Sequence, residues 1–358
     1  SDTTTNELTI DTTAPSITVN TRITKDQTPE LNGTTNDNTA TINVTINSIT
    51  YTATNNQDGT WTLADNTIQT LPEGTYNVTA NATDPLGNKR TDTTTNELVI
   101  DITQLTLTIT TSEPPITNAD PIPINITFSE EVVGFEITDI TTSNGVRSGF
   151  VKLGPKTYTS SIVPDNDGIV TVDINADVTK DLAGNNNLAA TQFTIMSDTT
   201  PPTVSITPLT TKDQTPQLTG TINDNNATIQ ITLNSNTYTA TNNKDGTWTL
   251  ADNTITTLPE GKYNVTITAT DNATNQGQDS TLDELTIDTT APTITVNTKT
   301  TNDQTPQLTG TTNDNNAIIN ITINSKTYTA TNNGDTTWTL ADNTITTLPE
   351  AVYNVQAK

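Results

Sequence analysis

Acidic residues recur at matching places along this chain, and their oxygen atoms are the chemistry that the sequence offers most clearly. Many of these aspartates stand near the ends of repeated segments, some with an asparagine four residues further on. Carboxylate and carbonyl oxygens are the ligands that Ca²⁺ prefers, roughly six to eight per ion. We therefore predict Ca²⁺ as a cofactor at the junctions between segments. The candidate ligands are Asp11, Asp26, Asp84, Asp101, Asp177, Asp181, Asp198, Asp213, Asp271, Asp288 and Asp303.

The same acids have a simpler interpretation, because Asp and Asn are common in turns, where they bond to nearby backbone groups. Both interpretations stay open at this point. The first junction is expected to be the weakest calcium site, since Asp101-Ile-Thr-Gln104 replaces the Asp-Thr-Thr-Ala-Pro motif found elsewhere. Asp165-Asn-Asp-Gly168 resembles the start of a calcium loop, but the later ligand positions do not follow, so a hairpin turn is expected there.

Catalytic chemistry is poorly represented. The chain has no His and no Cys, so the commonest general base and the thiol nucleophile are both missing. Glu130 and Glu131 are adjacent on an expected strand, where they would point to opposite faces and make a poor acid–base pair. The net charge of −26 repels nucleic acid and anionic membranes. We predict no enzymatic activity, no nucleic-acid partner and no membrane insertion.

The elements that must position these acids belong to a repeated unit. An Asp-Thr-Thr motif opens each copy, and a tryptophan follows fifty residues later. The positions are Asp11 and Trp61, Asp198 and Trp248, and Asp288 and Trp338. A fixed period indicates an array of one structural unit. The predicted segments are a spare last-type strand (1–10), a repeat (11–101), a sister-type repeat without the tryptophan (102–198), a repeat (199–288), and a repeat lacking its last strand (289–358).

Within a unit, apolar and polar residues alternate in short runs. Ile42, Val44 and Ile46 alternate with Thr and Asn, and the segment 76–82 shows the same pattern. A period of two is typical of half-buried strands. About seven such runs per unit, with Gly, Pro and Asn turns between them, predict an immunoglobulin-like β-sandwich. The predicted fold class is therefore all-β, with tandem Ig-like sandwiches in an extended rod and each tryptophan in a core.

Several motifs carry a family resemblance. Asp-Gly-Thr-Trp, Leu-Pro-Glu-Gly-x-Tyr and Ala-Thr-Asp recur, and Thr-Ala-Pro linkers join the units. The chain resembles the bacterial Ig-like repeats of large secreted and cell-surface adhesins. Segment 102–198, with Phe128-Ser-Glu-Glu-Val-Val-Gly-Phe135, is similar to a second Ig-like type interspersed in them. The resemblance implies an extracellular, non-enzymatic spacer that links or projects cells, as in biofilms. It also implies stiffening by Ca²⁺ at the junctions, and a surface ligand bound elsewhere in the full protein.

Two further interpretations concern carbohydrate. A glycan-binding module would require Trp61, Trp248 and Trp338 to be exposed stacking platforms. Glycosylation is a separate prediction that rests on Asn-x-Ser/Thr sequons, of which nine occur, fewer than chance gives for this composition. The glycosylation candidates are Asn43, Asn77, Asn81, Asn125, Asn264 and Asn320.

The two ends of the sequence match parts of the repeat. Residues 1–11 agree with residues 91–101 at nine of eleven positions, so Leu8 and Ile10 show the pattern of a last strand. Either the sequence is a window on a longer array, where adjacent repeats are the partners, or the first strand of one chain completes the last unit of another. The second interpretation predicts the alternative function, a pilus-like filament subunit that polymerises head-to-tail by strand donation.

Overall fold

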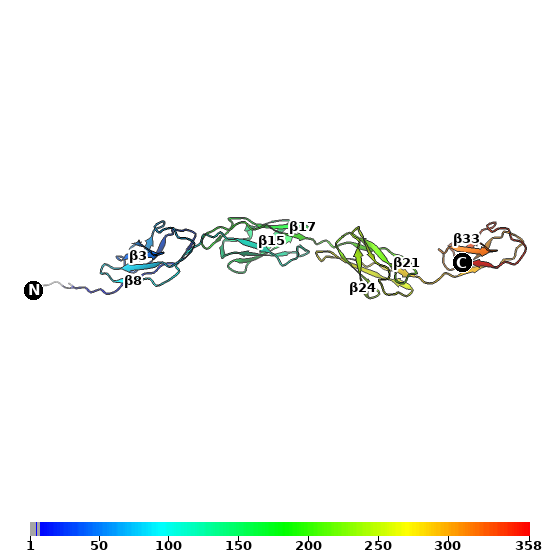
Figure 1. Cartoon of the computed structure of the whole chain (residues 1–358), viewed down its shortest axis with the longest axis horizontal. Helices are drawn as coiled ribbons and strands as arrows, with labels where there is room; N and C mark the ends of the chain where they lie inside the picture. Colours follow the sequence, from blue (N-terminus) through cyan, green and yellow to red (C-terminus); the bar gives the residue numbers. More distant parts are fainter. Residues whose placement is uncertain (1–4, 6–7) are drawn as a thin grey trace. The chain divides into compact units, whose positions relative to one another are not determined.

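The computed structural model describes residue 5 and residues 8–358. Over these residues the regular structure is β-strand apart from one short 3-10 helix, η1 (Ile137–Asp139). Four separate hydrophobic clusters lie along the sequence, each with its own group of strands (Figure 1). The predicted all-β class of tandem Ig-like sandwiches is confirmed. The predicted boundaries and the rod shape stay predictions, and the spare strand 1–10 lies partly outside the described residues.

The chain divides into two compact units. The first comprises the residues up to Pro202 together with Thr270–Gly277, the turn between β27 (Val265–Thr270) and β28 (Gln276–Asp279) with the adjoining strand ends. The second comprises Thr203–Ala269 and Gln278–Lys358. The first unit thus holds two complete hydrophobic clusters.

The first sandwich combines a sheet in the order β2-β5-β4-β3-β7-β8 with a small sheet, β1-β9-β6, and its core draws on both. In the small sheet, β9 is central: it pairs parallel with β1 and antiparallel with β6. The strands are β1 (Arg22–Thr24), β2 (Leu31–Thr34), β3 (Thr41–Ile46), β4 (Ile49–Asn55), β5 (Thr60–Leu63), β6 (Gly74–Tyr76), β7 (Thr79–Thr83), β8 (Lys89–Thr91) and β9 (Leu98–Ile100).

The hairpin between β3 and β4 shows how local sequence sets the register. Ile42, Val44 and Ile46 of β3 are buried, and Ile46 pairs with Ile49 across a two-residue turn. The turn residues Asn47 and Ser48 both have positive φ, 46° and 64°. This is the backbone of a type I′ turn, whose twist matches that of the paired strands. The same Asn-Ser turn recurs in the third and fourth sandwiches.

A buried tryptophan lies at the centre of each repeated sandwich. All three are fully removed from solvent, which confirms the predicted core position. Each indole N–H donates a hydrogen bond of 2.9 Å to a backbone carbonyl. The pairs are Trp61 to Thr18, Trp248 to Ser205, and Trp338 to Thr295. This hydrogen bond compensates for the hydration that the indole N–H loses on burial.

The second sandwich is built from two four-stranded sheets, β10-β12-β16-β15 and β11-β19-β17-β14, with the short pair β13-β18. An aromatic group takes the place of the tryptophan: Phe128 meets Phe135 and Tyr158 edge to face, with ring centroids 5.0 and 5.9 Å apart. The strands are β10 (Leu107–Thr110), β11 (Ile116–Thr117), β12 (Ile122–Phe128), β13 (Val132–Val133), β14 (Ile140–Ser143), β15 (Gly145–Lys152), β16 (Thr157–Pro164), β17 (Gly168–Ile174), β18 (Lys180–Asp181) and β19 (Phe193–Ser197).

The third sandwich repeats the first, with sheets β20-β22-β25-β24-β23-β27-β28 and β21-β29-β26. Here β29 takes the central place in the small sheet that β9 takes in the first sandwich. The strands are β20 (Val204–Ile206), β21 (Leu209–Thr211), β22 (Leu218–Ile222), β23 (Thr228–Leu233), β24 (Asn236–Asn242), β25 (Thr247–Leu250), β26 (Gly261–Tyr263), β27 (Val265–Thr270), β28 (Gln276–Asp279) and β29 (Leu285–Ile287).

The fourth sandwich has one sheet, β30-β31-β34-β33-β32-β35, in the part of the chain that the structure describes. The strands are β30 (Ile294–Val296), β31 (Leu308–Thr312), β32 (Ile319–Ile323), β33 (Lys326–Asn332), β34 (Thr337–Leu340) and β35 (Val355–Ala357).

Two sequence expectations need correction. Asp165-Asn-Asp-Gly168 is not a hairpin turn, because it connects β16 to β17, which belong to different sheets. Glu130 and Glu131 are not on a strand, because β12 ends at Phe128 and β13 begins at Val132. In both places a polar run follows a strand, and alternation alone does not show where the strand stops.

Trp248→Ala is expected to lower the free energy of unfolding of the third sandwich by about 3–5 kcal/mol, because it leaves a large cavity in a thin core. Denaturant unfolding followed by far-UV circular dichroism would show an early transition for this sandwich. Thr239→Ala, on the exposed face of β24, is the control and should change stability by less than about 0.5 kcal/mol. Equal losses in the two variants would contradict the core role of the tryptophan.

Candidate metal centre

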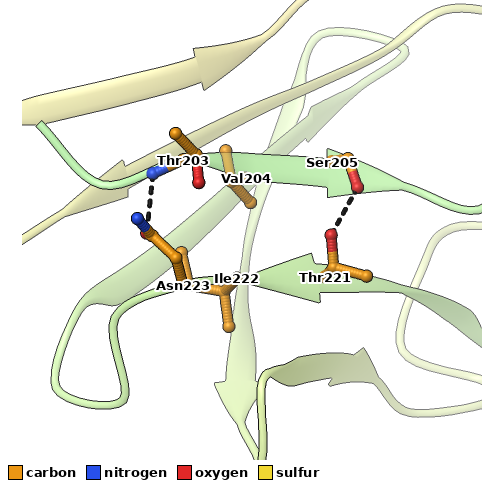
Figure 2. Close-up of a pocket in the computed structure, with 6 residues that line it drawn as sticks. All are labelled: Thr203, Val204, Ser205, Thr221, Ile222 and Asn223. Carbon is orange, nitrogen blue, oxygen red and sulfur yellow. Dashed lines mark hydrogen bonds between the residues drawn. The ribbon is translucent and has the colours of Figure 1, made fainter.

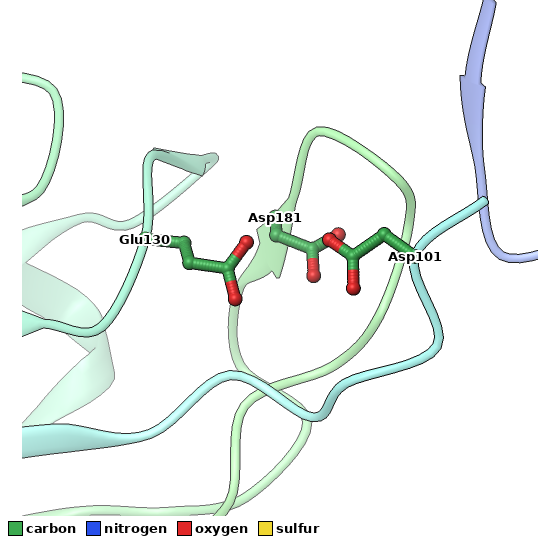
Figure 3. A group of neighbouring side chains, drawn as sticks. All are labelled: Asp101, Glu130 and Asp181. Atoms are coloured by element: carbon green, nitrogen blue, oxygen red, sulfur yellow. The ribbon is translucent and has the colours of Figure 1, made fainter. Parts of the chain in front are cut away.

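Three carboxylates meet where the first and second sandwiches join. Oxygen atoms of Asp101, Glu130 and Asp181 lie within 4.8 Å of one another. Figure 3 shows the three side chains approaching one another from three separate segments. Asp101 follows β9, Glu130 lies between β12 and β13, and Asp181 ends β18. The structure thus brings together two of the predicted ligands and adds a third that the sequence did not indicate.

An asparagine fixes two members of this cluster. The side-chain amide of Asn185 donates to Asp181 Oδ2 and to the backbone carbonyl of Asp101, both at 2.9 Å. The backbone N–H of Asn185 donates to Asp181 Oδ1, also at 2.9 Å. Asp181 and Asn185 are both buried, with exposed fractions of 3% and 6%. These hydrogen bonds hold the loop between Asp181 and Asn185 against the linker, and they do not require a bound metal ion.

The cluster has an unfavourable concentration of negative charge. Burial raises the pKa of the Glu130 carboxyl, and repulsion from Asp101 raises that pKa further, with smaller contributions from Asp181 and Glu73. A nearby like charge disfavours the ionised form, whereas a bound cation would favour it. Three carboxylates with no nitrogen or sulfur donor suit a hard divalent cation such as Ca²⁺ or Mg²⁺. These residues therefore fit the predicted cofactor.

The first junction was expected to be the weakest calcium site, because its linker departs from the Asp-Thr-Thr-Ala-Pro motif, and this ranking stays a prediction. The structure places three carboxylates together at this junction, because the sister-type sandwich contributes Glu130 from the loop after β12. Among the described residues, only Asp101, Glu130 and Asp181 form such a group.

The first and third sandwiches have the same arrangement, in which an asparagine joins a loop aspartate to a linker aspartate; we call it the asparagine clamp. Each loop aspartate accepts hydrogen bonds from the backbone and side chain of an asparagine four residues later, at 2.8–2.9 Å. The side-chain amide of the same asparagine also donates to the backbone carbonyl of a linker aspartate. The sets are Asp84, Asn88 and Asp11, and Asp271, Asn275 and Asp198. The hydrogen bond from the Asn88 side chain is the main cause of the lowered pKa of Asp84.

The other candidate ligands cap turns. Asp26, Asp213 and Asp303 each accept from the backbone N–H two residues later, at 2.8–2.9 Å. The linker aspartates Asp11, Asp101, Asp198 and Asp288 make the same bond, at 2.9–3.2 Å. Asp177 accepts from the Asn186 side chain within its own sandwich. For these residues the turn interpretation accounts for the contacts in the structure.

Hydroxyl groups of the linkers bind acids of the preceding sandwich, a contact that the sequence did not indicate. Thr103 Oγ1 donates to Glu73 at 2.9 Å, and Thr290 Oγ1 donates to Glu260 at 2.7 Å. Thr199 and Thr200 bind Asp167 in the same way. Hydrogen bonds from these threonines lower the pKa values of Glu260 and Asp167. Leu-Pro-Glu stands at the same distance before Asp101 and before Asp288, which was the available signal for Glu73 and Glu260.

A hollow on the third sandwich is not a site of this kind. It lies between β20 and β22, and Figure 2 shows two hydrogen bonds that cross it. Thr203 N donates to Asn223 Oδ1 at 2.8 Å, and the Ser205 and Thr221 hydroxyls are 2.7 Å apart. The same pairs recur in the first and fourth sandwiches. The hollow is therefore part of the repeated strand pairing.

The glycosylation candidates lie on strands or next to them, with exposed or half-buried side chains. Two of them accept a hydrogen bond from a backbone N–H group of a turn. Asn77 Oδ1 accepts from the Asn96 N–H at 2.8 Å, and Asn264 Oδ1 accepts from the Asp283 N–H at 2.9 Å. Glycosylation at Asn43, Asn77, Asn81, Asn125, Asn264 and Asn320 stays a prediction.

Comparison with known protein families decides the assignment of the chain. Two family models, each described as a bacterial Ig-like domain, match it, one over residues 101–196 and the other over residues 3–102 and 203–289. The chain belongs to the bacterial Ig-like domain family. A search of curated proteins with the amino-acid sequence found no match. Over the described residues, no helix has the length and apolar character needed to cross a membrane.

Solved structures give a weaker likeness to this bacterial Ig-like array. A tetra-tandem repeat in the extending region of a large adhesion protein is 24% identical, with a TM-score of 0.39 over 96% of this chain and 94% of that one. A Ca²⁺-stabilized adhesin of an Antarctic bacterium is 20% identical, with a TM-score of 0.29 over 92% and 91%. Invasin, a bacterial integrin-binding protein, is 14% identical, with a TM-score of 0.34 over 97% and 76%. These values do not assign a function to the chain.

Glu130→Gln is expected to stabilise the second sandwich at neutral pH in metal-free buffer, by no more than about 1 kcal/mol because solvent screens the charges. The raised pKa of Glu130 means that the folded protein holds this proton more tightly than the unfolded chain does. Wild-type stability should therefore lose this contribution as pH rises above 4.5, the ordinary pKa of the group, and the variant should not. Thermal unfolding of both proteins from pH 4 to 8 measures the difference. Parallel pH profiles would contradict the assigned repulsion.

Proposed function

We propose that this chain is a non-enzymatic spacer segment of a bacterial cell-surface adhesin. Its membership of the bacterial Ig-like family supports a tandem array of structural domains. Its motifs resemble those of adhesin repeats. The observation that carries the proposal is the way the linkers at Asp101 and Asp198 are held. At each of them, an acid before the linker binds its threonines, and an asparagine after it binds the carbonyl of its aspartate. At Asp101, such a linker favours a fixed orientation between the first and second sandwiches.

Direct contacts between domains add to this support within the first compact unit. Lys25 of the first sandwich donates to the carbonyl of Gly184 in the second at 2.8 Å, and its backbone N–H donates to Ala183 at 3.1 Å. Asn118 of the second sandwich donates to Asn275 at 3.1 Å. Neighbouring domains normally move relative to each other unless their interface is large and apolar. The hydrogen-bonded linkers therefore carry most of the proposed stiffness.

Asn185→Ala tests the linker contact. The variant should widen the distribution of distances between the first and second sandwiches, because it removes the bond from Asn185 to the Asp101 carbonyl. It should also lower the stability of the second sandwich by about 1–3 kcal/mol, since buried Asp181 loses its partner. Distances between paired spin labels or fluorophores measure the first effect. Asn186→Ala, whose side chain bonds within its own sandwich, is the matched control. Equal distributions in all three proteins would refute the spacer mechanism.

Calcium is the second part of the proposal. Asp101, Glu130 and Asp181 would hold the ion, which would supply positive charge at a place where acids of the linker and of the second sandwich meet. Asp101 belongs to the linker and the other two residues to the second sandwich. A bound ion would therefore restrict the first junction more than it would stabilise either sandwich alone.

Calorimetric titration with Ca²⁺ tests this part. Glu130→Gln should weaken Ca²⁺ binding by at least about tenfold, because it removes a charged ligand. Glu131→Gln, at the adjacent exposed residue, should bind as the wild type does. Binding should also weaken as pH falls towards the raised pKa of Glu130, because protons then compete with Ca²⁺ for this carboxylate. Wild-type protein that binds no better than Glu130→Gln would contradict the proposed site, while leaving the linker contacts in place.

The glycan-binding interpretation has no support from the tryptophans. Trp61, Trp248 and Trp338 have exposed fractions of 0%, so they cannot act as stacking platforms at the surface.

A further inference from the structure

The first three sandwiches each contain a pair of parallel strands that joins an early strand to the last one. In the first sandwich β1 pairs with β9, and in the third β21 pairs with β29. In the second sandwich the corresponding pair is β11 and β19. The strand that leads the chain out of each sandwich therefore runs beside an earlier strand and in the same direction.

The direction of these strands matters when the chain is stretched. Tension pulls the start of a sandwich toward one end of the chain and its last strand toward the other. Two parallel neighbours loaded in this way slide past each other, so the hydrogen bonds between them share the load. Forced unfolding is governed by the unfolding rate rather than by equilibrium stability. The number of bonds in each parallel pair is therefore expected to limit how fast a stretched sandwich unfolds.

The linker aspartates transmit tension directly to these pairs. The Asp101 N–H donates to the Thr24 carbonyl at 3.0 Å, which extends the pairing of β1 with β9 by one bond. The carbonyl of the same residue accepts from Asn185 of the second sandwich at 2.9 Å. The Asp198 N–H likewise donates to the Thr117 carbonyl at 2.9 Å. One linker residue thus joins the parallel pair of the preceding sandwich to the next sandwich.

The parallel pair is shorter in the second sandwich than in the other two. The pairs β1–β9 and β21–β29 each have three residues in register, whereas β11–β19 has two. At the first of the three positions, the Arg22 N–H donates to the Glu97 carbonyl at 2.6 Å, and the Leu209 N–H donates to the Glu284 carbonyl at 2.7 Å. Pro115 occupies the equivalent position and has no N–H to donate. The second sandwich therefore lacks one of the bonds that share the load.

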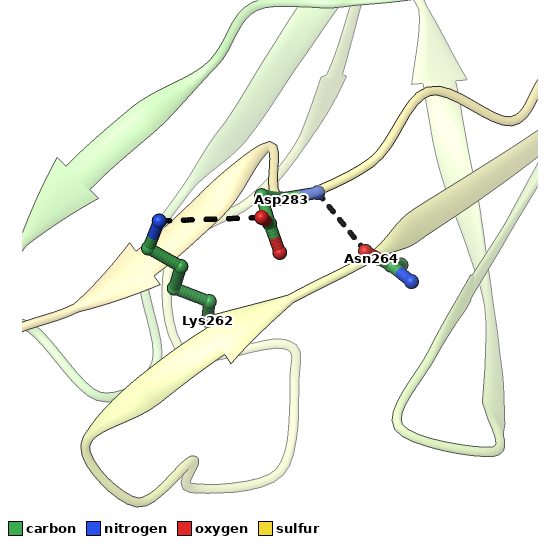
Figure 4. Close-up of polar contacts among 3 residues, drawn as sticks. All are labelled: Lys262, Asn264 and Asp283. Atoms are coloured by element: carbon green, nitrogen blue, oxygen red, sulfur yellow. Dashed lines mark hydrogen bonds and ion pairs between the residues drawn. The ribbon is translucent and has the colours of Figure 1, made fainter.

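The start of the last strand is also held by fewer side chains in the second sandwich. In the third sandwich the Asp283 N–H donates to Asn264 Oδ1 at 2.9 Å (Figure 4), and Glu284 Oε2 accepts from the Val265 N–H at 3.0 Å. The first sandwich has both contacts. The second sandwich has Thr194 at the position of the glutamate, with an exposed side chain that supplies no carboxylate.

The last strand of the second sandwich brings less apolar surface into its core. Ile100 of β9 and Ile287 of β29 are both buried, with exposed fractions of 1%, and Ser197 of β19 occupies the equivalent position. A serine buries less apolar surface than an isoleucine, so withdrawal of β19 exposes less of it to water. The backbone bonds and the side chains thus favour the same order of unfolding.

We propose that the second sandwich gives way first when the chain is stretched, while the first and third sandwiches stay folded. Its unfolding releases roughly 300 Å of chain, at about 3.5 Å per residue. The spacer then lengthens in one step before the sandwiches on either side of this element unfold. This inference rests on the proposed spacer role for its biological meaning, but the order of unfolding is a property of the chain itself.

Single-molecule stretching tests the order of unfolding. Force is applied to the full chain through handles on Thr12→Cys and Ala291→Cys, since the chain has no cysteine of its own. Both residues are exposed and lie outside the strands, and tension between them passes through the first three sandwiches alone. Under a slowly rising force, the first step should come from the second sandwich. A first step from the first or third sandwich would overturn the proposal.

Pro115→Leu identifies the step and tests its cause. The change provides an N–H at the position of Leu209, so the first step should become about fivefold slower at a fixed force. Pro114→Leu is the matched control, because the third sandwich has Pro208 at that position and uses no N–H there. The rate is measured because a proline also restricts the unfolded chain, which affects equilibrium stability. Equal rates of the first step in the two variants would overturn the proposal.

Leu209→Pro is the converse test. It removes the bond to the Glu284 carbonyl and gives the third sandwich the same Pro-Pro pair as the second. The third sandwich should then unfold about fivefold faster at a fixed force than in Leu209→Ala, which loses the side chain but keeps the N–H. Far-UV circular dichroism checks that both variants are folded before stretching. Equal rates would contradict the proposed cause, whereas the spacer role is tested separately by distances in the unstretched chain.

Discussion

A single indole between two thin sheets is the contact on which each repeated sandwich depends. Aromatic residues make up only 4% of the chain, so one tryptophan supplies much of each core. Its N–H is bonded to a carbonyl of a neighbouring segment, which fixes the ring. Gly220 shows how close the fit is, since an added Cβ would lie 1.9 Å from the Ser205 oxygen and 2.6 Å from the indole nitrogen of Trp248. The strand that pairs with the tryptophan strand therefore needs a glycine opposite the indole, as Gly220 of β22 is opposite Trp248 of β25.

The thin core explains why the central strand of the small sheet matters. In the first sandwich, β9 contributes Leu98 and Ile100 to a cluster that otherwise comes from the larger sheet and its loops. A larger domain would tolerate the loss of one short strand better, because more of its apolar surface is buried elsewhere. In the fourth sandwich, Val355 and Ala357 are only partly buried, whereas the equivalent Val78 and Ala80 of the first sandwich are buried.

The sequence allowed the fold to be predicted, but only part of the site. Alternation of apolar residues identified strands such as β3, because inward and outward faces differ there in type. It missed β2, Leu31–Thr34, whose Gly33 leaves room for the tryptophan and breaks the pattern. Asp101 and Asp181 were indicated by repetition. Glu130 was not, because its place beside them depends on a contact between two kinds of sandwich.

The linker contacts could not be predicted from the sequence for a similar reason. Asn185 and the Asp101 carbonyl are 84 residues apart, and Thr103 and Glu73 are 30 apart. Local patterns predict turns, and each linker aspartate does make the expected turn bond. The same residue also presents its carbonyl to a distant asparagine. One aspartate thus makes a local turn bond and a long-range hydrogen bond, and the sequence pattern predicts only the turn bond.

The near absence of ion pairs has a consequence for the surroundings in which such a chain works. With a net charge of −26, the described residues form one ion pair, Lys262 with Asp283 at 4.0 Å. The acids that matter for the linkers are bound by hydroxyl and amide groups instead. Dissolved salt weakens contacts between opposite charges, but it leaves these neutral donors in place and screens repulsion between the acids. The linker contacts are therefore less sensitive to salt than lysine and arginine ion pairs would be.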